Sequence, residues 1–235
     1  MSPAGTTATI DRAMPSAMSA PATSLKAMRP LKIKVGAASV AEDTRRVALV
    51  RRAIGDDAAL MVDANGAYSL TEAEIAGRAF SLYNLAWFEE PLHWYDPVTA
   101  LGKLASRLPV PIASGESEMH AWACRDLIDR GGVHFMQFDA ARYGGVTEWL
   151  RVAAYADLSG VAMTTHHAPH IQGHLAAAAR NGFSVETFPN AERDPVFANL
   201  YPIRAKLDRG RLILGDEPGF GFSINWDYLE KHRVQ

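Results

Sequence analysis

From residue 31 onward, short apolar runs alternate with longer segments in which apolar residues recur at helical spacing. Residues 31–35 predict a strand that ends at Gly36, and residues 40–54 predict a helix with Val47, Val50 and Ile54 on one face. The same alternation predicts strands at 59–62, 87–88, 111–113, 135–138, 161–164 and 183–185, and helices at 70–82, 98–106, 121–129, 146–156 and 171–179. Seven strands alternating with helices indicate βαβ units, a parallel sheet and an α/β fold of the (β/α) barrel type.

Residues 1–29 differ from the rest of the chain. They are dominated by Ala, Ser, Thr, Pro and Met, and Asp11 is their only acidic residue. They contain no apolar core long enough for a secretory signal peptide, and their composition favours a loosely ordered leader. Residues 6–10 could form one short strand, although the leader is the favoured interpretation. We therefore divide the chain into a leader at 1–29, a barrel at 30–205 and a C-terminal tail at 206–235.

Composition excludes several classes of protein. With 48% hydrophobic and 21% charged residues, the chain of 235 residues can bury a sizeable core and is not disordered as a whole. Its net charge of −2 offers no basic surface for nucleic acid or anionic lipid, and its single cysteine excludes a disulfide scaffold. No apolar run reaches the roughly 18 residues of a membrane span. We expect a cytoplasmic globular protein without nucleic-acid or membrane partners.

Each predicted strand ends at a polar side chain that could take part in chemistry. In chain order these are Lys34, Asp63, Glu89, Glu116, Asp139, His166 and Glu186. The carboxyl ends of barrel strands converge on one mouth, where the active sites of this architecture are built. So many ionisable groups are costly to bury together unless a cation compensates them. The pattern therefore predicts a bound metal ion.

Three of these side chains are carboxylates on successive strands, namely Asp63, Glu89 and Glu116. Hard oxygen ligands without cysteine favour Mg²⁺, which leaves coordination positions for water and substrate. Glu89 is followed by Glu90, and because side chains alternate along a strand only one of the two can point into the mouth. Glu89 shares the face of Trp87, but the sequence alone leaves open which face is inward.

A group of histidines offers an alternative metal site. His166, His170 and His174 have the spacing of one helical face, with His167 beside them, and imidazole is a good ligand for zinc. Pro169 interrupts such a helix between the first and the second of these residues. We therefore favour Mg²⁺ over zinc and place His174 in the helix that follows.

The ordered motifs resemble those of the mandelate racemase subgroup of the enolase superfamily. They are Lys-x-Lys (Lys32, Lys34), Asp-x-Asn (Asp63, Asn65), Glu-Glu-Pro (Glu89, Glu90, Pro91), Gly-Glu (Gly115, Glu116), Asp139 ahead of Gly144 and Gly145, His166 and Glu186. Each motif is weak alone, whereas seven in order at barrel spacing are highly specific. The resemblance covers about residue 31 to the C-terminus. It implies a TIM-type barrel, a Mg²⁺ ion and abstraction of the proton α to a carboxylate to give an enediolate.

The resemblance also implies a role for each residue. Asp63, Glu89 and Glu116 match the metal ligands of the family, which selects Glu89 over Glu90. The other positions match residues that act on or bind the substrate. Lys34 matches the base on one face of the substrate, and His166 matches the acid or base on the other face, with Asp139 as the partner that orients His166. Glu186 matches the group that stabilises the enediolate, and Lys32 and Asn65 match substrate-binding residues.

The sequence departs from the family at its N-terminal end. Members normally begin with an α+β capping domain that closes over the mouth, whereas only about 30 residues precede Lys32 here, and the first barrel strand and helix are expected to be missing. Residues 211–214 and 218–221 resemble the family's tail, which returns to the capping domain. A barrel short of one strand is expected to have two unpaired edges. Without a cap to exclude water and orient the substrate, we expect weak or absent turnover.

The favoured function is dehydration of a sugar acid in carbohydrate acid catabolism, which is lyase chemistry. The alternative within the family is an isomerase, a racemase or epimerase of an α-hydroxy acid, since a Lys34/His166 pair serves both reactions. A catalytically inactive barrel fragment is the alternative from another class. A Schiff-base aldolase using Lys34 is disfavoured because it does not need three ligand carboxylates. The partner is then a small hydroxy-carboxylate, and full-length relatives are expected to be homo-oligomers.

Overall fold

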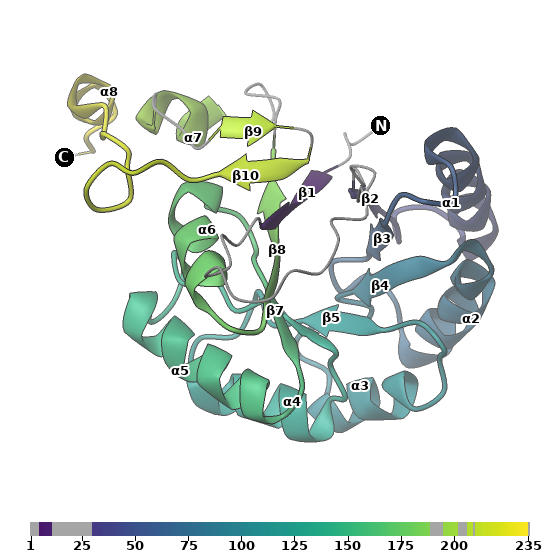
Figure 1. Cartoon of the computed structure of the whole chain (residues 1–235). Helices are drawn as coiled ribbons and strands as arrows, with labels where there is room; N and C mark the ends of the chain where they lie inside the picture. Colours follow the sequence, from purple (N-terminus) through teal and green to yellow (C-terminus); the bar gives the residue numbers. More distant parts are fainter. Residues whose placement is uncertain (1–4, 11–29, 189–194, 202–205, 209, 235) are drawn as a thin grey trace, which may run out of the picture.

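Seven parallel strands curl around a common axis with helices on their outer side (Figure 1). The computed structural model describes residues 5–10, 30–188, 195–201, 206–208 and 210–234, and for 5–10 it describes the backbone alone. The seven strands are β2 (Leu31–Lys34), β3 (Leu60–Asp63), β4 (Leu85–Glu89), β5 (Ile112–Ser114), β6 (Phe135–Met136), β7 (Ala162–Thr164) and β8 (Gly182–Thr187). Each pairs in parallel with the next in chain order, so the predicted barrel of the TIM type is confirmed.

The helices between these strands also match the predicted pattern. They are α1 (Val40–Ile54), α2 (Leu70–Phe80), α3 (Val98–Ala105), α4 (Ala121–Arg130), α5 (Gly145–Leu158) and α6 (Pro169–Ala178), with a short 3₁₀ helix η1 (Ser81–Tyr83) after α2. Local signals set their starts. Ser69 accepts a hydrogen bond from the Glu72 amide while Glu72 reaches back to the Ser69 amide, which is a capping box. Pro169 does not interrupt a helix but begins α6, at a position where its missing N–H costs nothing.

An eighth strand, β1 (Gly5–Ile10), lies inside the segment expected to be a leader. It runs antiparallel to both neighbours, pairing Thr6 with Thr187 of β8 and Gly5 with Lys32 of β2. The two edges that we expected to be free, those of β8 and β2, are therefore both paired with β1. Residues 1–4 and 11–29 of the expected leader lie outside the described residues.

The C-terminal tail extends the sheet on the far side of β1. It contains β9 (Lys206–Asp208), β10 (Arg211–Ile213) and α8 (Trp226–Lys231), and α7 (Pro195–Leu200) precedes it. β10 pairs in parallel with β1, with Thr9 opposite Arg211, and β9 pairs antiparallel with β10. The strand β1 thus belongs to the barrel and to this small sheet at once (Figure 1).

The barrel has two apolar layers. The larger layer packs between the strands and the helices, and Phe80, Phe88 and Trp149 are fully buried in it. The smaller layer is formed by Met61, Trp87 and Ala113. Because residues two apart on a strand share a face, Met61 and Trp87 lie on the same face as the strand-end acids that follow them. The smaller layer therefore forms the apolar floor beneath the polar residues of the mouth.

Within the part of the chain that the structure describes, every helix is too short or too polar to cross a lipid bilayer.

Candidate active site

Three carboxylates meet at the mouth of the barrel. Asp63 and Glu89 are the last residues of β3 and β4, and Glu116 follows β5 by two residues. One oxygen from each lies within 4.8 Å of the others, and all three side chains are buried. Parallel strands that end at the same level explain this convergence. Glu89, rather than Glu90, is the member of its pair that points into the cluster.

Lys32 supplies positive charge beneath the carboxylates. It is only 3% exposed, and its Nζ lies 2.7 Å from Glu186 Oε1 and 3.4 Å from Asp63 Oδ2 and donates a hydrogen bond to Glu89 Oε1. Burial by itself lowers the pKa of Lys32, but the charges of Glu186, Glu89 and Asp63 outweigh it and hold the pKa well above 10.5. Lys32 is therefore charged in the folded protein and offsets part of the cluster's negative charge.

The carboxylates around Lys32 respond differently to their surroundings. Burial and the charge of Asp63 raise the pKa of Glu89 well above its ordinary value, and the charge of Lys32 offsets only part of this effect. Burial also opposes ionisation of Glu186, but Lys32 and His166 outweigh it and lower the pKa of Glu186 to about 2. The protein's own cations therefore do not balance Glu89 fully.

The cluster fits a divalent cation. Glu116 Oε2 is buried and has no hydrogen-bond partner among the described residues, although a buried carboxylate oxygen without a partner is costly. Asp63, Glu89 and Glu116 offer only hard oxygen donors, which is the donor set that Mg²⁺ prefers. The chemistry of the donors and the unsatisfied oxygen both match such an ion.

Lys34 reaches the cluster from β2. Its Nζ donates hydrogen bonds to Asp63 Oδ2 and, at 2.5 Å, to Asn65 Oδ1. The Asn65 amide in turn donates to Asp63 Oδ1 at 3.0 Å, in a left-handed turn with φ 44°. The side chain of Lys34 is 31% exposed, in contrast to buried Lys32. Lys34 is therefore accessible from the mouth while it contacts the carboxylates.

His166 reaches the cluster from the end of β7. Its Nδ1 is 2.8 Å from Asp139 Oδ2 and its Nε2 is 3.6 Å from Glu116 Oε1. Burial lowers the pKa of the ring, but the hydrogen bond to Asp139 and the charges of Glu116 and Glu186 outweigh it, so the pKa of His166 is raised above 6.5. Lys34 and His166 thus contact different members of one carboxylate cluster.

Glu186 completes the set at the end of β8. Its Oε2 accepts a hydrogen bond of 2.9 Å from the backbone amide of His167, and its Oε1 pairs with Lys32. All the strand-end residues predicted from the sequence therefore gather at one mouth.

Gln172 is a site residue that the sequence analysis missed. It is fully buried on α6, and its Nε2 donates to Asp139 Oδ1 at 2.8 Å and to the carbonyl of His166. Its Oε1 accepts from the Ala140 amide at 3.3 Å. One side chain thus holds both members of the His166–Asp139 pair. No local motif indicates this role, because it depends on α6 packing against the ends of two strands.

The histidine group is divided between two places. His166, His167 and Glu186 bring ligand atoms within 4.8 Å of one another, as a second group that could hold a metal ion. His170 packs against the rings of Tyr201 and Phe222, and His174 Nε2 is 3.2 Å from the carbonyl of Phe220. His170 and His174 therefore face the C-terminal segment, and the helical zinc face considered from the sequence is not formed.

Asp139→Asn is expected to lower the pKa of His166, because the new amide donates to Nδ1 and favours the neutral ring. A histidine whose folded pKa is raised stabilises the fold fully below its unfolded value of about 6.5, and that contribution is lost as the pH rises through the folded pKa. The variant should therefore lose this pH-dependent part of its stability. NMR titration of the His166 ring checks the shift, with His174→Asn as the control. An unchanged His166 pKa would contradict the assigned pairing.

Comparison with known proteins identifies the family. A family model described as enolase C-terminal domain-like matches residues 17–228. The chain belongs to this family. The resemblance to the enolase superfamily is thereby confirmed, and solved structures agree with it. A mandelate racemase/muconate lactonizing enzyme from a marine actinobacterium superposes on this enolase-like barrel with a TM-score of 0.78 at 37% identity, covering 84% of this chain and 56% of that one.

Two further relatives of the enolase-like barrel are named as sugar acid dehydratases. L-talarate/galactarate dehydratase from Salmonella typhimurium is 35% identical over 195 residues, which are 83% of this chain and 47% of the relative. The structure of L-talarate dehydratase from a Polaromonas species, complexed with Mg and L-glucarate, has a TM-score of 0.76 at 36% identity, covering 83% of this chain and 52% of that one. The chain thus spans about half the length of these relatives.

Proposed function

We propose that this barrel carries the active site of a Mg²⁺-dependent enzyme that removes water from a sugar acid. One observation carries the proposal. Lys34 and His166, from β2 and from the end of β7, contact different members of a single buried carboxylate cluster. We infer that a substrate held at that cluster lies between these two proton-transfer groups. This arrangement suits removal of a proton α to a carboxylate.

Asp63, Glu89 and Glu116 are the residues that would hold the metal ion. When bound, Mg²⁺ supplies positive charge that stabilises the negative charge developing on the substrate carboxylate. Lys32 lies next to Glu186, and Asn65 next to Lys34, so Lys32 and Asn65 are placed to orient a substrate carboxylate, and Glu186 holds Lys32 in position. The apolar floor beneath them limits the water around these charges.

The dehydration needs one base and one acid. Lys34, as the neutral amine, takes the proton from Cα, and the electron pair of the broken C–H bond moves toward the carboxylate. The Cβ–O bond then breaks, and protonated His166 delivers its proton to the departing hydroxyl, so that water leaves. The electron pair returns to form a Cα=Cβ double bond, and the resulting enol takes up a proton at Cβ and loses the proton of its Cα hydroxyl, which gives a 2-keto acid. Asp139 stabilises the protonated form of His166 before this step.

The relatives support the substrate class. Two of them are named as dehydratases of talarate or galactarate, and one was crystallised with Mg and L-glucarate. These compounds are acid sugars with hydroxyl groups at the α and β carbons, as the proposed steps require.

The test is proton exchange in D₂O. The 235-residue chain is incubated with Mg²⁺ and one compound per sample, either galactarate, L-talarate, arabinonate or lactate. NMR follows the uptake of deuterium at Cα and the formation of 2-keto acid. We expect weak Mg²⁺-dependent deuterium exchange at Cα of at least one sugar acid, with slow formation of its 2-keto acid, in keeping with the weak turnover expected from the sequence. Exchange on its own requires less orientation than complete turnover, so it is the more sensitive readout.

Each of the other outcomes contradicts a part of the proposed function. Deuterium uptake without keto acid indicates racemase or epimerase chemistry. Binding of Mg²⁺ without any exchange after long incubation identifies an inactive barrel. Exchange that persists in the presence of EDTA contradicts the role of the metal.

A further inference from the structure

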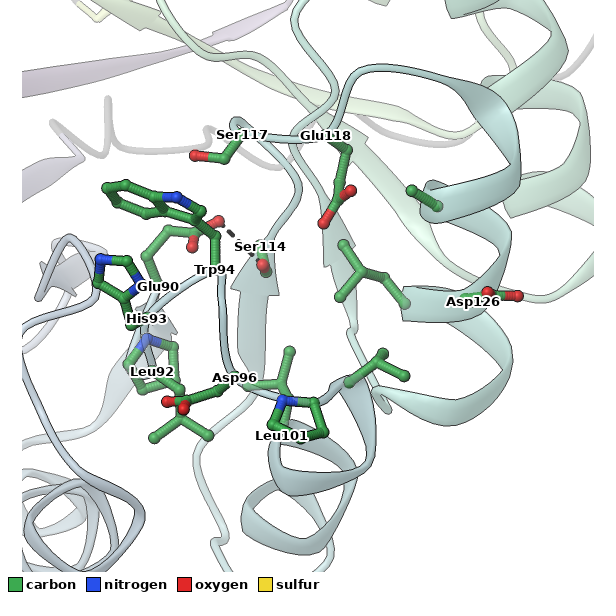
Figure 2. A pocket seen from close by; sticks show the side chains of 15 residues that line it. Glu90, Leu92, His93, Trp94, Asp96, Leu101, Ser114, Ser117, Glu118 and Asp126 are labelled. Atoms are coloured by element: carbon green, nitrogen blue, oxygen red, sulfur yellow. Dashed lines mark hydrogen bonds between the residues drawn. The ribbon is translucent and has the colours of Figure 1, made fainter.

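Glu90 lies just after the carboxyl end of β4, outside the cluster of candidate metal ligands. It directly follows Glu89, and its backbone has φ 41°, which turns the chain sharply at the end of β4. Its side chain lines a pocket of about 200 Å³ together with Trp94, Ser114 and Glu118, and Figure 2 shows these side chains around the pocket. Glu90 is nevertheless only 5% exposed. A buried carboxylate in a strained turn next to a candidate ligand needs a structural reason.

The hydrogen bonds of Glu90 join three strand ends. Its Oε1 accepts from Ser114 Oγ at 2.8 Å and from the Gly115 amide at 3.0 Å, both at the end of β5. Its own amide donates to the Ala113 carbonyl at 3.0 Å, and its carbonyl accepts from the Gly66 amide at 2.7 Å. Gly66 belongs to the turn after β3. One residue therefore connects the ends of β3, β4 and β5, which carry the three candidate ligands.

The contact with Gly115 determines where Glu116 lies. Gly115 has φ +124°, and a Cβ there would come within 2.6 Å of Met136 Sδ, so only glycine fits this turn. The amide that this turn presents to Glu90 belongs to the residue immediately before Glu116. A shift of that amide would move the backbone of Glu116 with it.

We propose that Glu90 is a positioning residue for the metal site, and that its carboxylate sets the spacing between Glu89 and Glu116 through the hydrogen bonds to Ser114 and Gly115. The inference rests on the proposed metal site. Residues that hydrogen-bond to a metal's ligands or to their backbone tune affinity without touching the ion. Loss of this support leaves the Gly115 amide buried without a partner and frees the end of β5.

Two substitutions of Glu90 separate the effect of the length of its side chain from the effect of its negative charge. Glu90→Gln keeps the length of the side chain and an acceptor oxygen but removes the charge, whereas Glu90→Asp keeps the charge but is one methylene too short to reach the Gly115 amide. Asp also tolerates the left-handed backbone at this position. Glu118→Gln is the matched control, because it removes a carboxylate from the same pocket.

Calorimetric titration with MgCl₂ measures the dissociation constant for Mg²⁺ of each variant. The titration is done at about pH 8, because burial and the charge of Glu116 raise the pKa of Glu90 to about 7. Glu90→Asp is expected to weaken Mg²⁺ binding by about 10- to 100-fold. Glu90→Gln should stay within a factor of about 3 of the parent, since an amide oxygen still accepts both hydrogen bonds. Glu118→Gln should match the parent. Thermal unfolding without Mg²⁺ reports on folding separately.

The possible results are distinguishable. If Glu90→Gln binds as weakly as Glu90→Asp, or Glu90→Asp binds as well as the parent, the carboxylate does not act by positioning and the inference is wrong. If Glu90→Asp does not fold, Ser114→Ala, which removes one of the two contacts, must weaken binding by itself or the inference fails. A parent chain that binds no Mg²⁺ overturns the proposed function together with this inference.

Discussion

Replacing Lys32 with methionine is expected to lower the free energy of unfolding by about 3–5 kcal/mol, because the substitution leaves buried carboxylates without their counter-charge. Lys32 is 3% exposed and pairs with Asp63, Glu89 and Glu186. Methionine has a similar length and is apolar, so packing changes little. Urea unfolding followed by circular dichroism at neutral pH measures the loss. Added Mg²⁺ should restore part of it, since the ion provides positive charge at the same cluster.

The pH dependence of this loss follows from the pKa shifts. The pKa of Lys32 is raised above 10.5, so its contribution is fully present below 10.5 and is lost as the pH rises through the folded pKa. The pKa of Glu186 is lowered from 4.5 to about 2, so its contribution is present above 4.5 and is lost as the pH falls toward 2. The difference between parent and variant should therefore shrink below pH 4.5. Lys103→Met, at an exposed lysine of α3, is the control. Equal stability of Lys32→Met and the parent would contradict the charge-balancing role.

Lys34→Ala and His166→Asn are expected to remove proton exchange from opposite faces of the substrate. In the D₂O experiment, each variant should lose exchange of one α-epimer by at least about 100-fold and retain exchange of the other, as expected for loss of one general acid or base. The reason is that the proposed function places these two groups on opposite sides of the substrate, with Lys34 beside Asp63 and His166 beside Glu116. NMR on the two epimers separately measures the effect.

Two remote substitutions are the controls for that experiment. Lys103→Ala removes an exposed lysine, and His174→Asn changes a histidine that contacts Phe220 instead of the cluster. Both should exchange both epimers like the parent. If Lys34→Ala or His166→Asn stops exchange of both epimers equally, the two groups do not act on separate faces.

The parallel strands and their helices could be predicted because each βα unit is defined by local signals. The strand at β2 ends where the apolar alternation ends, and α1 begins after Ser39, whose side chain accepts from the Glu42 amide. The gathering of Asp63, Glu89 and Glu116 follows from the same regularity, because parallel strands of a barrel end at one mouth. The repeated strand–helix pattern was therefore enough to predict the fold and most residues of the candidate site.

The features that could not be predicted depend on distant contacts. The strand β1 was raised only as a possibility at residues 6–10, because its short Thr- and Ala-rich sequence is a weak local signal and the strand is stabilised by pairing with β8 and β2, far along the chain. Gln172 and Glu90 matter only through the strand ends they touch. Pro169 was expected to interrupt a helix, whereas it begins α6, because the sequence does not distinguish a helix start from an interruption.

The direction of β1 has a practical consequence for handling this protein. Because β1 runs against its neighbours, with Thr6 opposite Thr187 at the end of β8, Gly5 lies at the mouth end of the sheet and Ile10 at the opposite end. In a barrel whose strands all run in one direction, the first strand instead begins at the end opposite the mouth. A purification tag or fluorophore joined directly to Gly5 therefore starts at the mouth end of the sheet. A loss of binding that disappears when the tag is removed then indicates obstruction of the mouth rather than damage to the carboxylate cluster.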